Sequence, residues 1–155
     1  MRPIGDDGTP AGSGKPSEAG PRGAPARTRG RQAALDVLFE ADQRGLDPLP
    51  LAEVRLAGEG VARAFARTLV AGVAAHGEEV DEALETYSLG WPLARMPAVD
   101  RSIARLGAYE ILFGDDVPDP VVLGEAADLA GRLSTAKSAT FISGLLARIS
   151  AMKAR

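Results

Sequence analysis

The chain has 155 residues, 45% of them hydrophobic and 25% charged, with a formal net charge of −3 and no cysteine. A chain of this size and hydrophobicity can bury one sizeable core, so a single folded domain is expected. The lack of cysteine excludes disulfides, thiolate metal sites and cysteine nucleophiles. The sequence shows neither an apolar run long enough to span a membrane nor an N-terminal secretion signal, so a cytoplasmic location without membrane contact is expected.

The net charge hides an asymmetry along the chain. Residues 1–31 carry six Lys or Arg against three acidic residues, a net charge of +3, so the other 124 residues carry −6. A basic arm on an acidic body is compatible with a nucleic-acid partner even though the whole chain is acidic.

Residues 1–26 are rich in Gly, Pro and Ala and contain almost no apolar residue that could pack, so they are predicted to form a disordered tail. The simplest interpretation is an extension without a defined role. The alternative is that Arg22 helps to hold an RNA. The folded domain is then expected to span residues 27–152.

The apolar spacing predicts helices throughout this domain. The first is expected over residues 29–44, with Thr28 as N-cap and Gly45 as the stop. A short helix over 51–57 and a long periodic run over 61–87 follow, and Gly72 and Gly77 predict a bend or a close helix contact within that run.

A central helix is expected over residues 97–113, because Pro97 suits a helix start and Asp100 a first turn. A turn over 114–120, a helix from about 121 to 133, a loop over 134–140 and a last helix over 140–151 complete the chain. No alternating strand pattern is present, so the fold is predicted to be all-α with six or seven helices.

We find no set of residues that indicates an enzyme, a metal site or a cofactor. His76 is the single histidine and lies on an apolar stripe, where packing and hydrogen bonding are the usual roles. Gly12-Ser13-Gly14-Lys15-Pro16 lacks the preceding strand and the hydroxyl residue of a phosphate-binding loop. The acidic residues of the turn and of the central helix have no second catalytic group beside them.

An ordered set of short motifs resembles the NusB family of bacterial transcription antitermination factors. The motifs run from about residue 27 to residue 150 with matching spacing: Leu69-Val70-Ala71-Gly72-Val73, Pro97-Ala98-Val99-Asp100-Arg101, Tyr109-Glu110, Asp116-Val117-Pro118, Glu125-Ala126 and Phe141-Ile142-Ser143-Gly144-Leu145-Leu146. The resemblance implies two three-helix subdomains. It also implies a non-enzymatic factor that binds boxA-type single-stranded leader RNA together with the ribosomal protein NusE. This complex would act on the RNA polymerase elongation complex, with other Nus factors, in ribosomal RNA operons.

Carried over by position, the family's RNA site joins the Arg-rich start of the first helix to the region before the last helix. The expected RNA contacts are Arg27, Arg29, Arg31, Gln32, Lys137, Ser138 and Phe141. Three cations at a helix start are disfavoured by the helix dipole, which invites a functional reason for them. For Phe141 a core position is an equally good interpretation, because it shares a stripe with Leu145.

The expected contacts with the protein partner are Tyr87, Asp100 and Arg101, of which Asp100 occupies the acidic position that the family uses at this interface. Its other interpretation is complementing the helix dipole alone. An acidic body facing a basic ribosomal protein would speed association. The resemblance also allows a homodimer.

Two alternatives stay open at the level of the sequence. The chain could be the NusB-like domain of an rRNA methyltransferase system, or a helical protein-interaction adaptor that does not bind RNA. The second is motivated by departures from the family pattern: Gly124 and Ser143 stand where relatives have Asn, and Thr28 and Gly30 thin the basic cluster.

Overall fold

The structure is a computed structural model that describes residues 25–153, and these residues fold entirely into helices and connections. The prediction of an all-α fold with six or seven helices is confirmed. The described part of the chain contains seven α-helices and one short 3₁₀ helix: α2 (Pro25–Arg44), α3 (Pro48–Arg55), α4 (Val61–Ala75), α5 (Gly77–Tyr87), η2 (Leu93–Arg95), α6 (Ala98–Phe113), α7 (Asp119–Leu133) and α8 (Ala136–Lys153). The predicted tail lies outside the described residues, except that Pro25 and Ala26 already belong to α2.

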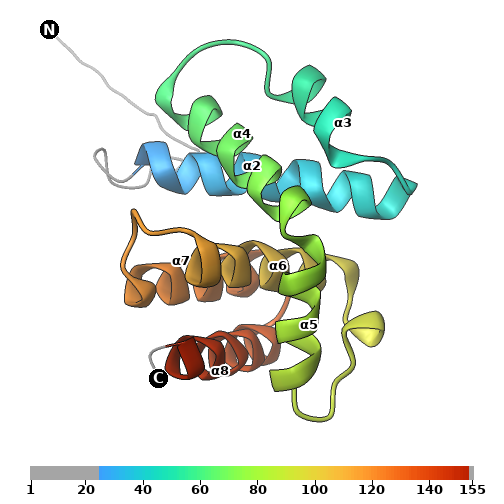
Figure 1. Ribbon diagram of the computed structural model, residues 1–155, viewed down its shortest axis with the longest axis vertical. Coiled ribbons are helices and arrows are strands. Elements are labelled where there is room, and N and C mark those ends of the chain that lie inside the picture. The colour runs from blue at the N-terminus through green and yellow to red at the C-terminus, as the bar shows by residue number, and fades with distance from the viewer. Residues whose placement is uncertain (1–24, 154–155) are drawn as a thin grey trace, which may run out of the picture.

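The helices pack as two groups of three, as predicted. Helices α2, α3 and α4 contact one another in the N-terminal group, and α6, α7 and α8 do so in the C-terminal group (Figure 1). Helix α5 packs on α6 and α8, while α2 and α4 both contact α6 and so join the groups. In this arrangement α6 is the central helix.

The run predicted over 61–87 is not one helix, because the chain breaks into α4 and α5 at His76, next to Gly77, where a bend was expected. His76 has φ −112° and ψ 24°, which leaves the α-helical region and turns the chain. Gly77 follows the break, whereas Gly72 has a different role. A Cβ atom on Gly72 would lie 2.1 Å from Cζ of Tyr109, so this glycine lets the ring of α6 approach the backbone of α4.

Three helix starts also differ from the prediction. Helix α2 begins before Thr28, so Thr28 is not its N-cap. Helix α3 begins at Pro48 and is capped by Asp47, whose side chain accepts a hydrogen bond from the Leu49 N–H at 3.0 Å. Helix α8 begins at Ala136, so most of the loop predicted over 134–140 is helical.

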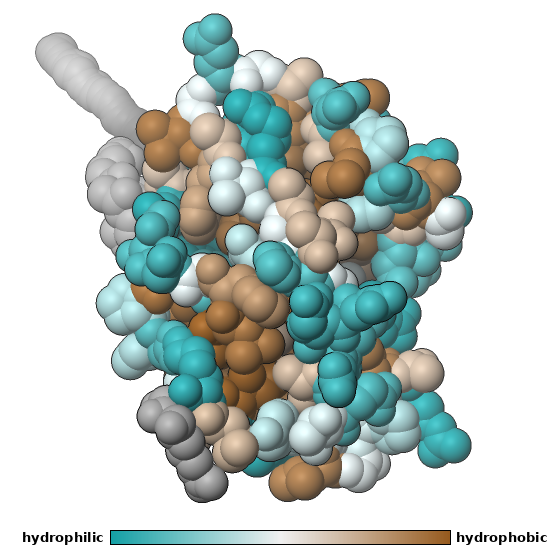
Figure 2. Space-filling model, viewed as in Figure 1, coloured by the Kyte–Doolittle hydropathy of each residue, from teal (hydrophilic) through white to brown (hydrophobic). Residues whose placement is uncertain are grey.

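The interior is formed by apolar side chains from all seven α-helices and η2, gathered into one continuous core. In the face shown in Figure 2, apolar side chains also gather on the surface between α6 and α8, with hydrophilic side chains around them. No helix within residues 25–153 combines the length and apolarity that a membrane span requires.

Candidate nucleic-acid and protein interface

The three arginines at the start of α2 do not form one cluster, because Arg27 and Arg31 lie over Phe65 of α4 and Arg29 does not. The guanidinium carbons of Arg27 and Arg31, one helical turn apart, lie 4.6 and 5.2 Å from the ring centre of Phe65 on α4. Arg29 lies between them in sequence, is exposed and points away from α4. Arg27 is 44% exposed and lies 3.9 Å from a carboxylate oxygen of Asp116. Arg27 and Arg29 therefore both reach solvent, on two sides of the helix, but Arg27 is partly neutralised.

Arg31 is buried and holds α2 against α6. Its Nε and Nη2 donate to the two carboxylate oxygens of Glu110 at 2.7 and 2.8 Å, and both side chains are at most 6% exposed. Its Nη1 lies 3.6 Å from a carboxylate oxygen of Glu125 on α7. The sequence groups Arg31 with the RNA contacts, but here every face of its guanidinium is occupied by protein.

The second predicted region, at the start of α8, presents one cation and one aromatic ring. Lys137 is exposed, and Phe141 follows it one turn later on the same side of the helix. Phe141 is half-buried and packs edge-to-face on Trp91, with ring centres 4.6 Å apart. Ser138 is buried, and its hydroxyl donates to Asp100 at 2.5 Å.

A groove of about 610 Å³ runs along α2 from Gln32 and is closed by Leu133 at the end of α7. One wall comes from α2, through Gln32, Leu35, Asp36, Phe39 and Gln43, and the other from the start of α6 and the end of α7, through Pro97, Ala98, Val99 and Leu133. Gln32 donates to a carboxylate oxygen of Asp36 at 3.2 Å. Burial raises the pKa of Asp36, and the bond from Gln32 partly opposes that shift. The groove combines polar groups of α2, among them Gln32 and Asp36, with an apolar floor.

The predicted partner contacts are mostly internal. Asp100 has no exposed surface. Arg101 donates to Asp42 of α2 at 2.7 Å and to the carbonyl of Met96 at 3.0 Å. Tyr87 is half-buried, and its carbonyl accepts a bond from Arg148 at 2.9 Å.

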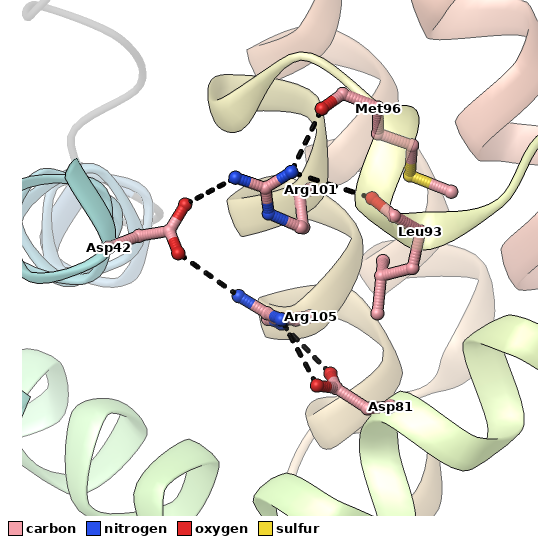
Figure 3. Close-up of polar contacts among 6 residues, drawn as sticks. All are labelled: Asp42, Asp81, Leu93, Met96, Arg101 and Arg105. Atoms are coloured by element: carbon pink, nitrogen blue, oxygen red, sulfur yellow. Dashed lines mark hydrogen bonds and ion pairs between the residues drawn. The ribbon is translucent and has the colours of Figure 1, made fainter. Parts of the chain in front are cut away.

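Arg101 belongs to a chain of charges that spans the two helix groups (Figure 3). Asp42 of α2 lies between Arg101 and Arg105 of α6, at 2.7 and 3.7 Å. Arg105 in turn makes two hydrogen bonds to Asp81 of α5, at 2.8 and 3.0 Å. Asp42, Arg101 and Arg105 are each less than 27% exposed. The cluster therefore mainly holds α2 against α6, and little of its charge is accessible to a partner.

His76 stacks on the ring of Phe113, with ring centres 3.8 Å apart, as its apolar position suggested. The expected hydrogen bond is not formed: the buried Nδ1 has no hydrogen-bond partner, and the nearest carboxylate oxygen of Glu79 is 4.0 Å away. Within residues 25–153, no three potential ligands among His, Cys, Asp and Glu are grouped as a metal site would require.

Sequence reasoning missed two exposed or half-exposed aromatic residues. Trp91 is the single tryptophan of the chain, but it stands between Gly90 and Pro92, outside any apolar period. Phe39 falls on the apolar stripe of the first helix, but it is 38% exposed and lines the groove. For Phe39 the available signal was the width of the apolar stripe on the first helix: a stripe wider than one packing interface leaves some apolar side chains at the surface.

Exposed cations and half-exposed aromatic rings near an apolar groove are typical of one class of protein, the helical binding proteins. The comparison with known proteins identifies the family. The profile of the NusB family matches residues 28–151, so the chain belongs to the NusB family.

Relatives and solved structures agree with this assignment. The transcription antitermination protein NusB of Kineococcus radiotolerans is 50% identical over 129 residues, which cover 83% of this chain and 95% of that protein. Its counterpart from Acidothermus cellulolyticus is 52% identical over 131 residues, covering 84% and 90%. The structure of T. maritima NusB is similar with a TM-score of 0.76 and 32% identity, covering 83% of this chain and 93% of that one. A crystal structure of the antitermination factors NusB and NusE in complex with double-stranded RNA contains a chain with a TM-score of 0.73 and 28% identity, with coverage of 82% and 97%.

Proposed function

We propose that this protein is a cytoplasmic transcription antitermination factor. It binds a boxA-type leader RNA together with the ribosomal protein NusE and acts on the RNA polymerase elongation complex, with other Nus factors, in ribosomal RNA operons. The observation that carries the proposal is family membership at about 50% identity to proteins named for antitermination. The function needs no catalytic step, because joining an RNA to a protein surface is enough.

The RNA surface is assigned to exposed groups on both sides of the groove. Arg29 and Gln32 of α2 supply a cation and an amide that can read a base edge, and Lys137 of α8 supplies a second cation. Arg27 extends this surface around the start of α2. Phe141 and Trp91 can stack on an unpaired base where their edges are exposed.

The partner surface is assigned to the apolar floor of the groove. Phe39 and Leu133 are 38% and 42% exposed and face each other across it with Val99. An exposed apolar groove with a polar rim is typical of a protein-interaction site. The acidic body around it favours a basic partner such as a ribosomal protein.

The test is binding of a labelled single-stranded boxA-type RNA. It is run against a scrambled RNA and the double-stranded form, with and without NusE, at two salt concentrations. Preferential binding that strengthens with NusE and weakens with salt is expected. No RNA binding under any condition would reject the RNA half of the proposal and favour the adaptor without RNA binding, whereas binding without sequence preference would reject recognition of boxA.

Two variants locate the surface. Arg29→Ala and Lys137→Ala are each expected to weaken RNA binding about three- to tenfold, as loss of one phosphate contact does. Arg44→Ala is the matched control, because it removes the same charge from the other end of α2, about 22 Å away at 1.5 Å per residue. An equal loss in all three variants would show that only net charge matters and would reject the assigned surface.

A further inference from the structure

A directed chain of hydroxyl groups connects Asp100 of α6 to the start of α8. The Ser138 hydroxyl donates its one proton to the Asp100 carboxylate at 2.5 Å. It accepts bonds from the hydroxyls of Ser134 and Thr135 at 3.2 and 3.0 Å. The Ser138 N–H donates to the Thr135 hydroxyl at 2.9 Å, which caps the first turn of α8. One carboxylate therefore orders the whole connection between α7 and α8.

The carboxylate of Asp100 is in an unusual environment. It has no exposed surface, and within the described chain no cation lies at ion-pair distance from it. One of its oxygens has no hydrogen-bond partner. It lies in the first turn of α6 and, through Ser138, beside the first turn of α8, near the positive ends of two helix dipoles. This side chain therefore links the starts of two helices.

Both ends of this network reach candidate binding surfaces. Val99, next to Asp100, and Leu133, next to Ser134, line the groove assigned to the protein partner. Lys137, next to Ser138, is an exposed cation assigned to RNA. A change in the groove can therefore reach Lys137 through two hydrogen bonds and one helix cap.

We propose that Asp100 is a positioning residue that couples the partner groove to the RNA surface, and that it does not itself contact the partner. A partner bound between Val99 and Leu133 immobilises the start of α6 and the end of α7. Because Asp100 is hydrogen-bonded to Ser138, the first turn of α8 is immobilised with them. Lys137 is then fixed in the position that binds RNA. This inference rests on the proposed function and adds the physical link between its two partners.

The test compares Asp100→Asn with Ser138→Ala, which act on the same bond from opposite helices: the first replaces the charged acceptor by a neutral amide and weakens the bond, and the second removes the donor. In each variant NusE is expected to bind as tightly as it does to the unchanged protein, within about twofold. The strengthening of RNA binding by NusE is expected to fall at least about fivefold, the lower range of an allosteric coupling. The double variant is expected to lose no more than either single variant, because the sites act through one bond.

Two further readouts separate coupling from a general loss of stability. Amide hydrogen exchange is expected to accelerate in residues 134–138 and to stay unchanged in α2 and α4. Lys137→Ala is expected to weaken RNA binding in the unchanged protein but to add almost nothing in Asp100→Asn. Additive losses, or faster exchange throughout the chain, would overturn the inference.

The inference can fail separately from the proposed function. If the unchanged protein shows no RNA preference, the proposed function fails, whatever the variants do. If it binds RNA with NusE but Asp100→Asn chiefly weakens NusE binding, Asp100 is a direct partner contact and the coupling role is wrong. If Ser138→Ala leaves both interactions unchanged, the hydroxyl network has no part in binding.

Discussion

The pair between Arg31 and Glu110 gives the sharpest test of how the structure assigns the basic residues. Arg31→Met keeps much of the side-chain volume but leaves the Glu110 carboxylate buried without the two bonds it now accepts at 2.7 and 2.8 Å. Removing one member of a buried ion pair costs about 3–5 kcal/mol. For a domain of this size each kcal/mol shifts Tm by about 2–4 °C, so Tm is expected to fall by roughly 6–20 °C.

The assay is thermal unfolding followed by circular dichroism, with RNA binding measured at a temperature where every variant is folded. Arg31→Met/Glu110→Leu is expected to recover most of the lost stability, because an apolar pair of similar volume can replace a buried ion pair. Arg29→Met is the control, with little change in Tm and weaker RNA binding, since Arg29 is exposed. An unchanged Tm with lost RNA binding in Arg31→Met would refute the assignment of Arg31 to the interior.

Two further predictions concern helix packing and pH. Gly72→Ala places a Cβ atom 2.1 Å from Cζ of Tyr109, so the free energy of unfolding measured with denaturant should fall by about 1–3 kcal/mol. The control Gly131→Ala, with no atom within 4 Å of the new Cβ, should raise the free energy of unfolding by about 0.5–1 kcal/mol. Equal effects would contradict this packing. Hydrogen bonds from Arg55 and Arg44 lower the pKa of Glu40 from 4.5 to about 2. Because the folded-state pKa is depressed, this stabilisation is complete above pH 4.5 and is lost as the pH falls toward 2, so the Tm difference between the unchanged protein and Glu40→Gln should shrink over that range. A constant difference would show that Glu40 stabilises the fold without its charge.

The existence of the helices could be predicted from the sequence because their apolar spacing is local information. Their ends depend on contacts that the spacing does not contain. The apolar period runs on from Val73 to Val80, yet the chain turns at His76, where the ring stacks on Phe113 of α6. Similarly, Ser134 and Thr135 are typical loop residues, but Thr135 caps a helix that starts directly after it.

The candidate site was predictable only in part, because charge alone does not show which side chains face solvent. Arg29 and Arg31 have the same residue type and lie two positions apart, but a helix sends them to different sides. What buries Arg31 is Glu110, which is 79 positions further along the chain. The same applies to Asp100, whose partner Ser138 is 38 positions away. Family position identified both residues as important, while the structure assigns them internal contacts.

Gly30 shows why the basic edge of α2 is not denser in this protein. By sequence it is a departure that thins the arginine cluster, but it lies where α2 crosses α4. A Cβ atom there would be 2.8 Å from a ring carbon of Phe65 and 2.9 Å from the backbone oxygen of Ala62. A backbone oxygen cannot move aside as a flexible side chain can, so any larger residue would force the two helices apart. The same Phe65 ring lies under Arg27 and Arg31, so close helix packing and the placement of the flanking arginines depend on one contact. Additional positive charge for RNA binding therefore has to come from elsewhere on the surface, and Lys137 of α8 is in a position to supply it.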